Sequence, residues 1–166
     1  MQNRYGLRYQ NETTVIFIQS KSYAIPEKTI NNNTEGAMMP LVKISILEGR
    51  SDSDKKQILD IVHSSLVEAF KIPDNDRTQR VYEFDKADFE FPDYISDKFT
   101  IIEIVAFPGR SIEAKKTLYK LIFTELNKLG YQDNDSLVVL HEPSLENWGW
   151  GGKSAQEIDL GFSLDV

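Results

Sequence analysis

The stretch LVKISILEGRSDSDKKQIL at residues 41–59 recurs in outline as TIIEIVAFPGRSIEAKKTLY at residues 100–119. Each copy starts with a strand-like apolar run, passes through Gly-Arg-Ser and, after three more residues, reaches a pair of lysines. The turn-forming triplet Asp-Asn-Asp also occurs twice, at 74–76 and again at 133–135. Two repeated motifs in the same order indicate an internal duplication, in which one structural unit is used twice.

Each copy predicts a β-α-β unit, which places the chain in the α+β (α/β) class. Alternation of apolar and polar residues marks each first strand, and the serine after Gly-Arg suits the N-cap of a helix. The expected elements are strands at 41–47 and about 79–84 around a helix at about 52–70, then strands at 100–107 and 137–140 around a helix at about 112–129. Right-handed crossovers would place both helices on one face of a four-stranded sheet. Because the other face would stay uncovered, we expect an oligomer.

The composition of the chain changes at residue 40. Residues 1–39 lack the repeat and contain a polar stretch, so we expect an N-terminal extension that is disordered or lies upstream of the true start. Residues 40–166 are expected to form the single folded domain.

Composition excludes several classes of function. A formal charge of −7 argues against nucleic acid or an anionic membrane as the partner, and no run approaches the ~18 apolar residues of a membrane span. The absence of cysteine fits a reducing compartment, so we expect a cytoplasmic protein. Two histidines are too few for a multi-histidine metal site, and no phosphate loop, dinucleotide fingerprint or zinc motif occurs. We therefore expect no metal and no cofactor.

Pro40 allows two interpretations. Within the chain it suits the first residue of a strand, because proline has no N–H to give to a neighbouring strand. If translation starts at Met39 and that residue is removed, Pro40 instead carries a free secondary amine, and an α-amino group titrates near pH ~7.7–8.0. Burial would lower that pKa further, and the amine could then act as a general base at neutral pH.

The sequence pattern alone does not show whether the remaining polar residues have structural or functional roles. His63 on the first helix is expected to be a hydrogen-bonded packing residue, and residues 74–76 are turn formers. Arg110 follows a strand whose carboxyl end is a common place for ligands in α/β sheets. Arg50 holds the equivalent place in the first copy, so the repeat alone does not assign a function to Arg110.

A set of short motifs goes further than the repeat does. The motifs are Pro40-Leu41-Val42-Lys43, Leu47-Glu48-Gly49-Arg50-Ser51, the stretch Ile72 to Gln79, Phe107-Pro108-Gly109-Arg110-Ser111 and Glu146-Asn147-Trp148-Gly149. Together they resemble the tautomerase superfamily, in particular its longer-subunit branch that includes malonate semialdehyde decarboxylase. The resemblance covers 40–166 and none of 1–39. It implies a duplicated β-α-β fold assembled as a homotrimer, no cofactor, and a small carboxylate substrate.

The resemblance also implies roles for individual residues. Pro40 matches the catalytic amino-terminal proline, Asp76 matches an aspartate that orients or activates water, and Arg110 matches the substrate-binding arginine. Four further residues are candidates for binding the substrate: Arg77, Gln79, Phe107 and Trp148. Phe107, Trp148 and Tyr82 are also candidate apolar walls that would keep the amine pKa low.

The function expected from these residues is keto–enol proton transfer on a 2-oxo acid of the phenylpyruvate type. Decarboxylases of the branch carry a further arginine two residues before the one that Arg110 matches. Here the loop is one residue longer and Phe107 takes the nearest place, which favours tautomerisation. The alternatives are a decarboxylase or hydratase of a short 3-oxo or unsaturated acid, and a non-catalytic trimeric ligand-binding protein if residues 1–39 are retained.

Overall fold

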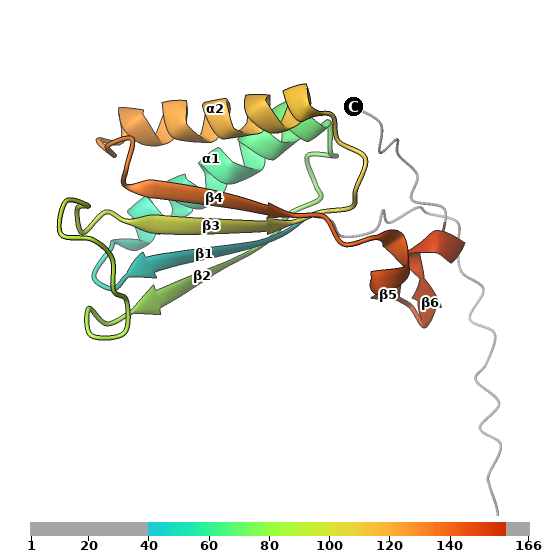
Figure 1. The fold of residues 1–166 in the computed structure, drawn as a ribbon, viewed down its shortest axis with the longest axis horizontal. Coiled ribbons are helices and arrows are strands. Elements are labelled where there is room, and N and C mark those ends of the chain that lie inside the picture. Colours follow the sequence, from blue (N-terminus) through green and yellow to red (C-terminus); the bar gives the residue numbers. More distant parts are fainter. Residues whose placement is uncertain (1–39, 159–166) are drawn as a thin grey trace, which may run out of the picture. The chain divides into compact units, whose positions relative to one another are not determined.

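The computed structural model describes residues 40–158, and its elements follow the two copies in order (Figure 1). The first copy comprises strand β1 (Leu41–Leu47), helix α1 (Asp52–Phe70) and strand β2 (Thr78–Phe84). The second comprises β3 (Thr100–Val105), α2 (Ile112–Lys128) and β4 (Ser136–His141). A C-terminal segment adds the 3-10 helices η1 (Leu145–Asn147) and η2 (Ala155–Glu157) and two short strands, β5 (Gly149–Trp150) and β6 (Lys153–Ser154). The predicted pair of β-α-β units is confirmed.

Both long helices begin where the sequence predicts. The hydroxyls of Ser51 and Ser111 each accept a hydrogen bond of 3.1 Å from the backbone N–H three residues further on. Just before them, Gly49 and Gly109 have φ angles of 93° and 121°, which residues with a side chain rarely adopt. The repeated Gly-Arg-Ser therefore encodes the same strand-to-helix turn twice.

Two strand boundaries differ from the prediction. Strand β3 ends at Val105 rather than at residue 107. Ala106 still donates to the carbonyl of His141 at 2.9 Å, but Pro108 has no N–H to continue the pairing. Strand β4 is longer than expected by one residue at each end. The predicted N-terminal extension, residues 1–39, lies outside the described residues.

The four strands form one mixed sheet in the order β2-β1-β3-β4. The strands of each copy are parallel, whereas β1 and β3, which join the two copies, are antiparallel. The carboxyl ends of β1 and β3 therefore lie at opposite ends of the sheet. We call the end where β1 begins and β3 finishes the Pro40 end, and the opposite end the loop end, after the loop at residues 85–99.

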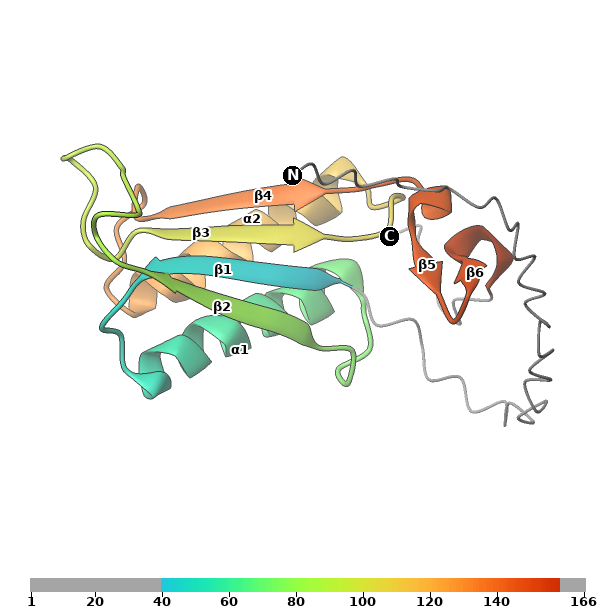
Figure 2. The same ribbon diagram turned by 90° about the horizontal axis from the view of Figure 1, so that it is seen from below.

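Helices α1 and α2 lie side by side on one face of the sheet, as predicted (Figures 1 and 2). The core between the two layers is built from alternate residues of the central strands and from one side of each helix. Its most deeply buried members are Val42, Ile44, Ile46, Ile102 and Ile104 from the strands, and Ile58, Val62, Leu66, Leu118, Ile122 and Leu126 from the helices. None of the helices within residues 40–158 is long and apolar enough to cross a membrane.

The opposite face of the sheet is covered by no helix of residues 40–158 (Figure 1). It carries a row of charged residues, Arg80 of β2, Lys43 of β1 and Glu103 of β3, with Leu41 and Ile101 on either side of that row. Two large apolar side chains of the edge strands are especially exposed, Tyr82 at 40% and Leu137 at 47%. Large apolar side chains exposed on an uncovered sheet face fit a surface that another protein chain covers.

The loop at residues 85–99 is held by aromatic rings. The ring of Phe89 lies 5.6 Å from those of Phe84 and Phe99, and the ring of Phe91 lies 5.1 Å from that of Phe99, between centroids. Offset and tilted contacts of this kind are the favourable arrangements of aromatic pairs. The loop is therefore a packed connection.

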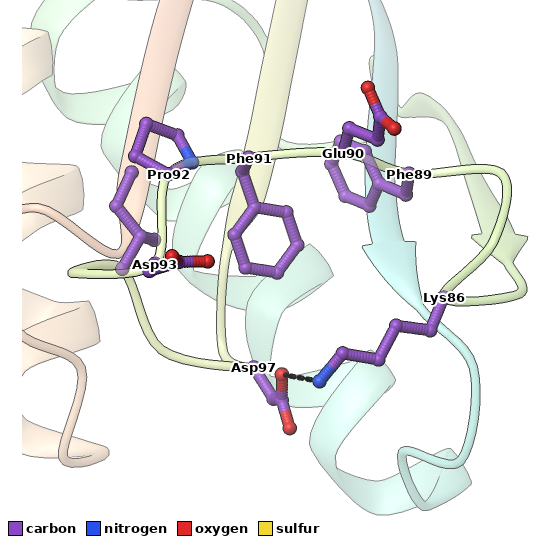
Figure 3. A pocket seen from close by; sticks show the side chains of 8 residues that line it. Lys86, Phe89, Glu90, Phe91, Pro92, Asp93 and Asp97 are labelled. Atoms are coloured by element: carbon purple, nitrogen blue, oxygen red, sulfur yellow. Dashed lines mark hydrogen bonds and ion pairs between the residues drawn. The ribbon is translucent and has the colours of Figure 1, made fainter.

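The same loop borders a hollow of about 610 Å³ at the loop end. Figure 3 shows Phe89 and Phe91 on its wall, and an ion pair of 2.9 Å between Lys86 and Asp97 beside them. None of the residues that the tautomerase resemblance singles out lines this hollow. Its size alone does not make it the candidate site.

Candidate active site

Strand register brings the predicted site residues to the Pro40 end. Leu41 is paired with Val105 of β3 on one side and with Thr78 of β2 on the other. Pro40 is buried and directly precedes Leu41, so it is flanked by the segment that follows β3 and by the segment that precedes β2. The first of these contains Phe107 and Arg110, and the second contains residues 76 and 77.

Arg110 is a buried cation that lacks partners. Its side chain is only 6% exposed, and neither Nε nor Nη1 has a hydrogen-bond partner among the described residues. The guanidinium carbon lies 5.3 Å from the ring centroid of Phe70, the last residue of α1. Burial lowers the pKa of Arg110, while the negative charge of Glu142 acts in the opposite direction. An anion could supply the missing acceptors.

Arg50, the equivalent residue of the first copy, has hydrogen-bond partners at both terminal nitrogens. It donates to the hydroxyl of Tyr131 and, at 3.2 Å, to the carbonyl of Phe99. Its guanidinium carbon also lies 5.4 Å from the centre of the Tyr131 ring. Arg50 follows β1 and so lies at the loop end, where it fastens the start of β3. The ambiguity between the two arginines is thereby resolved in favour of Arg110 as the available one.

The stretch Asp76-Arg77-Thr78-Gln79, which leads into β2, lies beside Pro40. Asp76 is half-buried, and its N–H donates to the carbonyl of Pro73 at 3.0 Å. Arg77 is exposed and pairs with Asp60 of α1 at 2.6 Å, while its Nε donates to Gln79 at 3.0 Å. The Nε2 amide nitrogen of Gln79 is buried without a partner in the described region. Arg77 would have to leave Asp60 to contact a substrate.

An apolar wall stands at the same end of the sheet. Phe107 is 3% exposed, and its ring meets that of Trp148 edge-on at 5.0 Å. Leu41, Leu145 and Ala155 pack against this pair. The indole N–H of Trp148 donates to the carbonyl of Pro143 at 3.1 Å, which fixes the ring. The C-terminal segment thus closes over the start of β1.

Tyr82 does not belong to this wall within one chain. It lies opposite Ser45, four residues along β2 from Thr78, which is about 13 Å along a strand. Its side chain is on the uncovered face of the sheet. The sequence expectation for Tyr82 is therefore wrong for a single chain, because alternation fixes the face but not the distance from Pro40.

His63 and the second Asp-Asn-Asp turn, at residues 133–135, have structural roles. His63 is 6% exposed, and its Nε2 lies 2.9 Å from the carbonyl oxygen of Asp74, as expected of a packing histidine. Asp135, the counterpart of Asp76, accepts from the N–H groups of Ser96 and Gln132. In residues 40–158, no group of three or more metal-binding side chains is placed to hold an ion.

Two charged residues near Arg110 were not singled out by the sequence. Lys115, on the first turn of α2, forms a hydrogen-bonded ion pair with Oε2 of Glu142, which follows β4. The other oxygen, Oε1, is buried with no partner in the described part of the chain. The repeat could have pointed to Glu142, because Glu83 and Glu142 are 59 residues apart, the same spacing as that of the two Asp-Asn-Asp turns.

Comparison with known proteins assigns the chain to a class. Two family models described as tautomerase enzyme match it, one over residues 40–98 and the other over residues 76–151. A probable tautomerase of Bacillus subtilis (strain 168), YrdN, is 31% identical over 123 residues, which cover 71% of this chain and 95% of YrdN. The chain belongs to the tautomerase family of enzymes, as the motifs indicate.

Particular relatives agree with this assignment. A second probable tautomerase of B. subtilis, YusQ, is 28% identical over 127 residues, which span its whole length and 73% of this chain. Among solved structures, malonate semialdehyde decarboxylase is 31% identical over 70% of this chain and 94% of its own, with a TM-score of 0.62. A fused 4-OT trimer shares the fold with a TM-score of 0.64 at 18% identity.

Proposed function

We propose that residues 40–166 form a cofactor-independent tautomerase that moves a proton between the keto and enol forms of a 2-oxo acid of the phenylpyruvate type. The observation that carries the proposal is the buried guanidinium of Arg110, whose Nε and Nη1 have no hydrogen-bond partner within residues 40–158, at the end of the sheet where Pro40 stands. A buried charge without partners is costly, so such a group points to a ligand of opposite charge. The two oxygens of a carboxylate match a guanidinium.

Pro40 supplies the base in this proposal, provided that the chain begins there. The free amine takes a proton from the carbon next to the ketone, and the carbonyl oxygen takes up the negative charge as an enolate. Return of the proton to that oxygen gives the enol, and ketonisation is the reverse. The buried position of Pro40 and the apolar pair Phe107 and Trp148 favour a neutral amine.

Support for a start at Pro40 comes from the comparisons. One tautomerase model matches from residue 40 onward. The malonate semialdehyde decarboxylase study includes a variant whose first residue, a proline, is replaced by alanine. With residues 1–39 attached, the nitrogen of Pro40 is an amide and cannot accept a proton.

A decarboxylase or hydratase is the second candidate. It is favoured by the 31% identity to malonate semialdehyde decarboxylase, a protein studied for its decarboxylase and hydratase activities. In this reading Asp76 orients water and Pro40 acts as an acid. Asp76→Asn would then abolish decarboxylation or hydration but leave any tautomerase activity. The tautomerase proposal does not require Asp76→Asn to affect the two activities differently.

We also propose that the uncovered sheet face is buried between copies in a homotrimer. The exposed Leu137 and Tyr82 on that face support this, as does the shared fold with trimeric fused 4-OT. Sedimentation equilibrium should give three times the mass of one chain. Leu137→Lys, which introduces a charge on that face, should reduce the trimer fraction, and a monomeric wild type would exclude this assembly.

The function is tested by ketonisation of phenylenolpyruvate. The protein is produced from Met39 so that removal of Met leaves Pro40 first, and intact mass verifies the start. Pro40→Ala should lower the rate by about 100-fold or more, because general acid–base catalysis typically supplies that factor. Pro92→Ala, the same change in the loop at the other end of the sheet, should have no effect. Equal rates for Pro40→Ala and wild type would exclude Pro40 as the base.

A further inference from the structure

The duplication has copied a group of three charged residues as well as the backbone. In the first copy the group is Arg50, Lys55 and Glu83, with Lys55 paired to Glu83 at 3.1 Å. In the second copy it is Arg110, Lys115 and Glu142, with Lys115 bonded to Glu142. In both, the arginine precedes the helix, the lysine lies on its first turn, and the glutamate lies at or after the end of the second strand.

The two groups differ in what the arginine does. Both terminal nitrogens of Arg50 donate hydrogen bonds, one to the Tyr131 hydroxyl and the other to the Phe99 carbonyl. Arg110 has no such partners among the described residues, although it is almost completely buried. A lysine–glutamate pair thus occurs in both copies, although Lys55 also pairs with Asp52 at 3.0 Å. Only the second pair lies beside an arginine with partner-free nitrogens in the described region.

The charges around Arg110 determine how an anion is received. Glu142 directly follows His141, whose carbonyl accepts from the N–H of Ala106 at 2.9 Å, so it lies at the same end of the sheet as Arg110. Burial lowers the pKa of Arg110, and the negative charge of Glu142 acts against that lowering. The same negative charge would repel a carboxylate. Lys115, bonded to Oε2, offsets that repulsion and holds Glu142 in place. The net charge of the pair is zero, and Arg110 supplies the uncompensated positive charge.

We propose that Lys115 and Glu142 are positioning residues that set the affinity of Arg110 for a carboxylate, Glu142 lowering it and Lys115 restoring it. This deepens the proposed function and rests on it for the identity of the substrate. Arg110 is the group that touches the carboxylate, and the pair acts through Arg110. The first-copy pair at the loop end has no such effect and serves as a built-in control.

The test measures binding of phenylacetate, a carboxylate that is not turned over, by calorimetry. It is run on the full chain and on the protein that begins at Pro40. Lys115→Met leaves an extra negative charge beside Arg110 and should weaken binding by about three- to tenfold. Glu142→Gln should tighten it by a similar factor, and the double variant should return close to wild type. Lys55→Met and Glu83→Gln make the same charge changes at the loop end and should alter Kd less than about twofold.

The sign of the two effects separates positioning from mere structural support. If the pair only fastens α2 to β4, both single variants weaken binding together, and the proposal is overturned. The proposal is also overturned if Lys55→Met and Glu83→Gln change Kd as much as Lys115→Met and Glu142→Gln do. Ketonisation kinetics distinguish the two levels. If wild type turns over phenylenolpyruvate but Lys115→Met and Glu142→Gln do not shift KM in opposite directions, only the role of the pair is refuted. If the two variants shift the Kd of phenylacetate in opposite directions but wild type shows no turnover, only the proposed function is refuted. A protein that binds no carboxylate refutes both.

Discussion

Arg50 and Arg110 hold the same place in the two copies, 60 residues apart, yet they meet opposite surroundings. Arg50 is bonded to the Tyr131 hydroxyl and the Phe99 carbonyl. Arg110 is buried over the ring of Phe70 with two nitrogens lacking a partner in the described region. The arginine of the first copy holds the structure together, whereas the partner-free nitrogens of Arg110 are the basis of the carboxylate site proposed above.

This difference predicts opposite effects of the same substitution. Arg50→Met removes the hydrogen bonds to the Tyr131 hydroxyl and the Phe99 carbonyl, so stability should fall by about 1–3 kcal/mol. Arg110→Met replaces an unpaired buried cation with an apolar chain, so stability should be unchanged or higher. Urea unfolding of both variants measures this. A larger loss for Arg110→Met would show that Arg110 is satisfied in the folded protein.

The wall beside Pro40 should depend on Phe107. Phe107→Ala would leave a cavity against Trp148 and Leu41 and should lower stability by about 3 kcal/mol, the low end for a buried phenylalanine. The Trp148 ring would lose its edge-on neighbour, so its fluorescence maximum should move to longer wavelength. Phe89→Ala, which removes a ring from the loop at the other end, should leave the Trp148 fluorescence unchanged.

Asp135 should make part of the stability dependent on pH. Burial by itself would raise the pKa of Asp135, but hydrogen bonds from Gln132 and Ser96 outweigh it and lower the pKa. A carboxyl whose pKa is lower in the folded state stabilises the fold fully above its unfolded pKa of about 4, and the contribution is lost as pH falls through the folded value. The stability difference between wild type and Asp135→Asn should therefore be constant near neutral pH and shrink below about pH 4.

His63 should matter for the position of the segment that carries Asp76. His63→Leu keeps the buried volume but removes the contact of 2.9 Å with the carbonyl of Asp74. Because Asp74 is exposed, water can replace the lost contact, and the stability loss should stay near 1 kcal/mol or below. Exchange of the Asp76 amide hydrogen should become faster. An unchanged exchange rate would mean that the turn is held by its own backbone bonds alone.

Much of the fold could be predicted from local sequence. Alternation in Leu41–Leu47, the N-cap at Ser51 and the glycine before each arginine specify strand, turn and helix through interactions within a few residues. Because the second copy repeats these features, the same strand, turn and helix are predicted there. Boundaries such as the end of β3 were missed, because a strand ends where its partner ends and where Pro108 cannot pair.

The sequence by itself determined that two β-α-β units exist, that Pro40 heads the first, and that Arg110 and Arg50 are equivalent. Only the tertiary structure decided between the two arginines. Antiparallel pairing of β1 with β3 sends the turn after each strand to opposite ends of the sheet. One arginine therefore bonds to Tyr131 and Phe99, whereas the other lies over the ring of Phe70 and in the field of the Glu142 charge. Equivalent residues of a duplicated sequence therefore differ in hydrogen bonding and burial, because different distant residues pack at the two ends of the sheet.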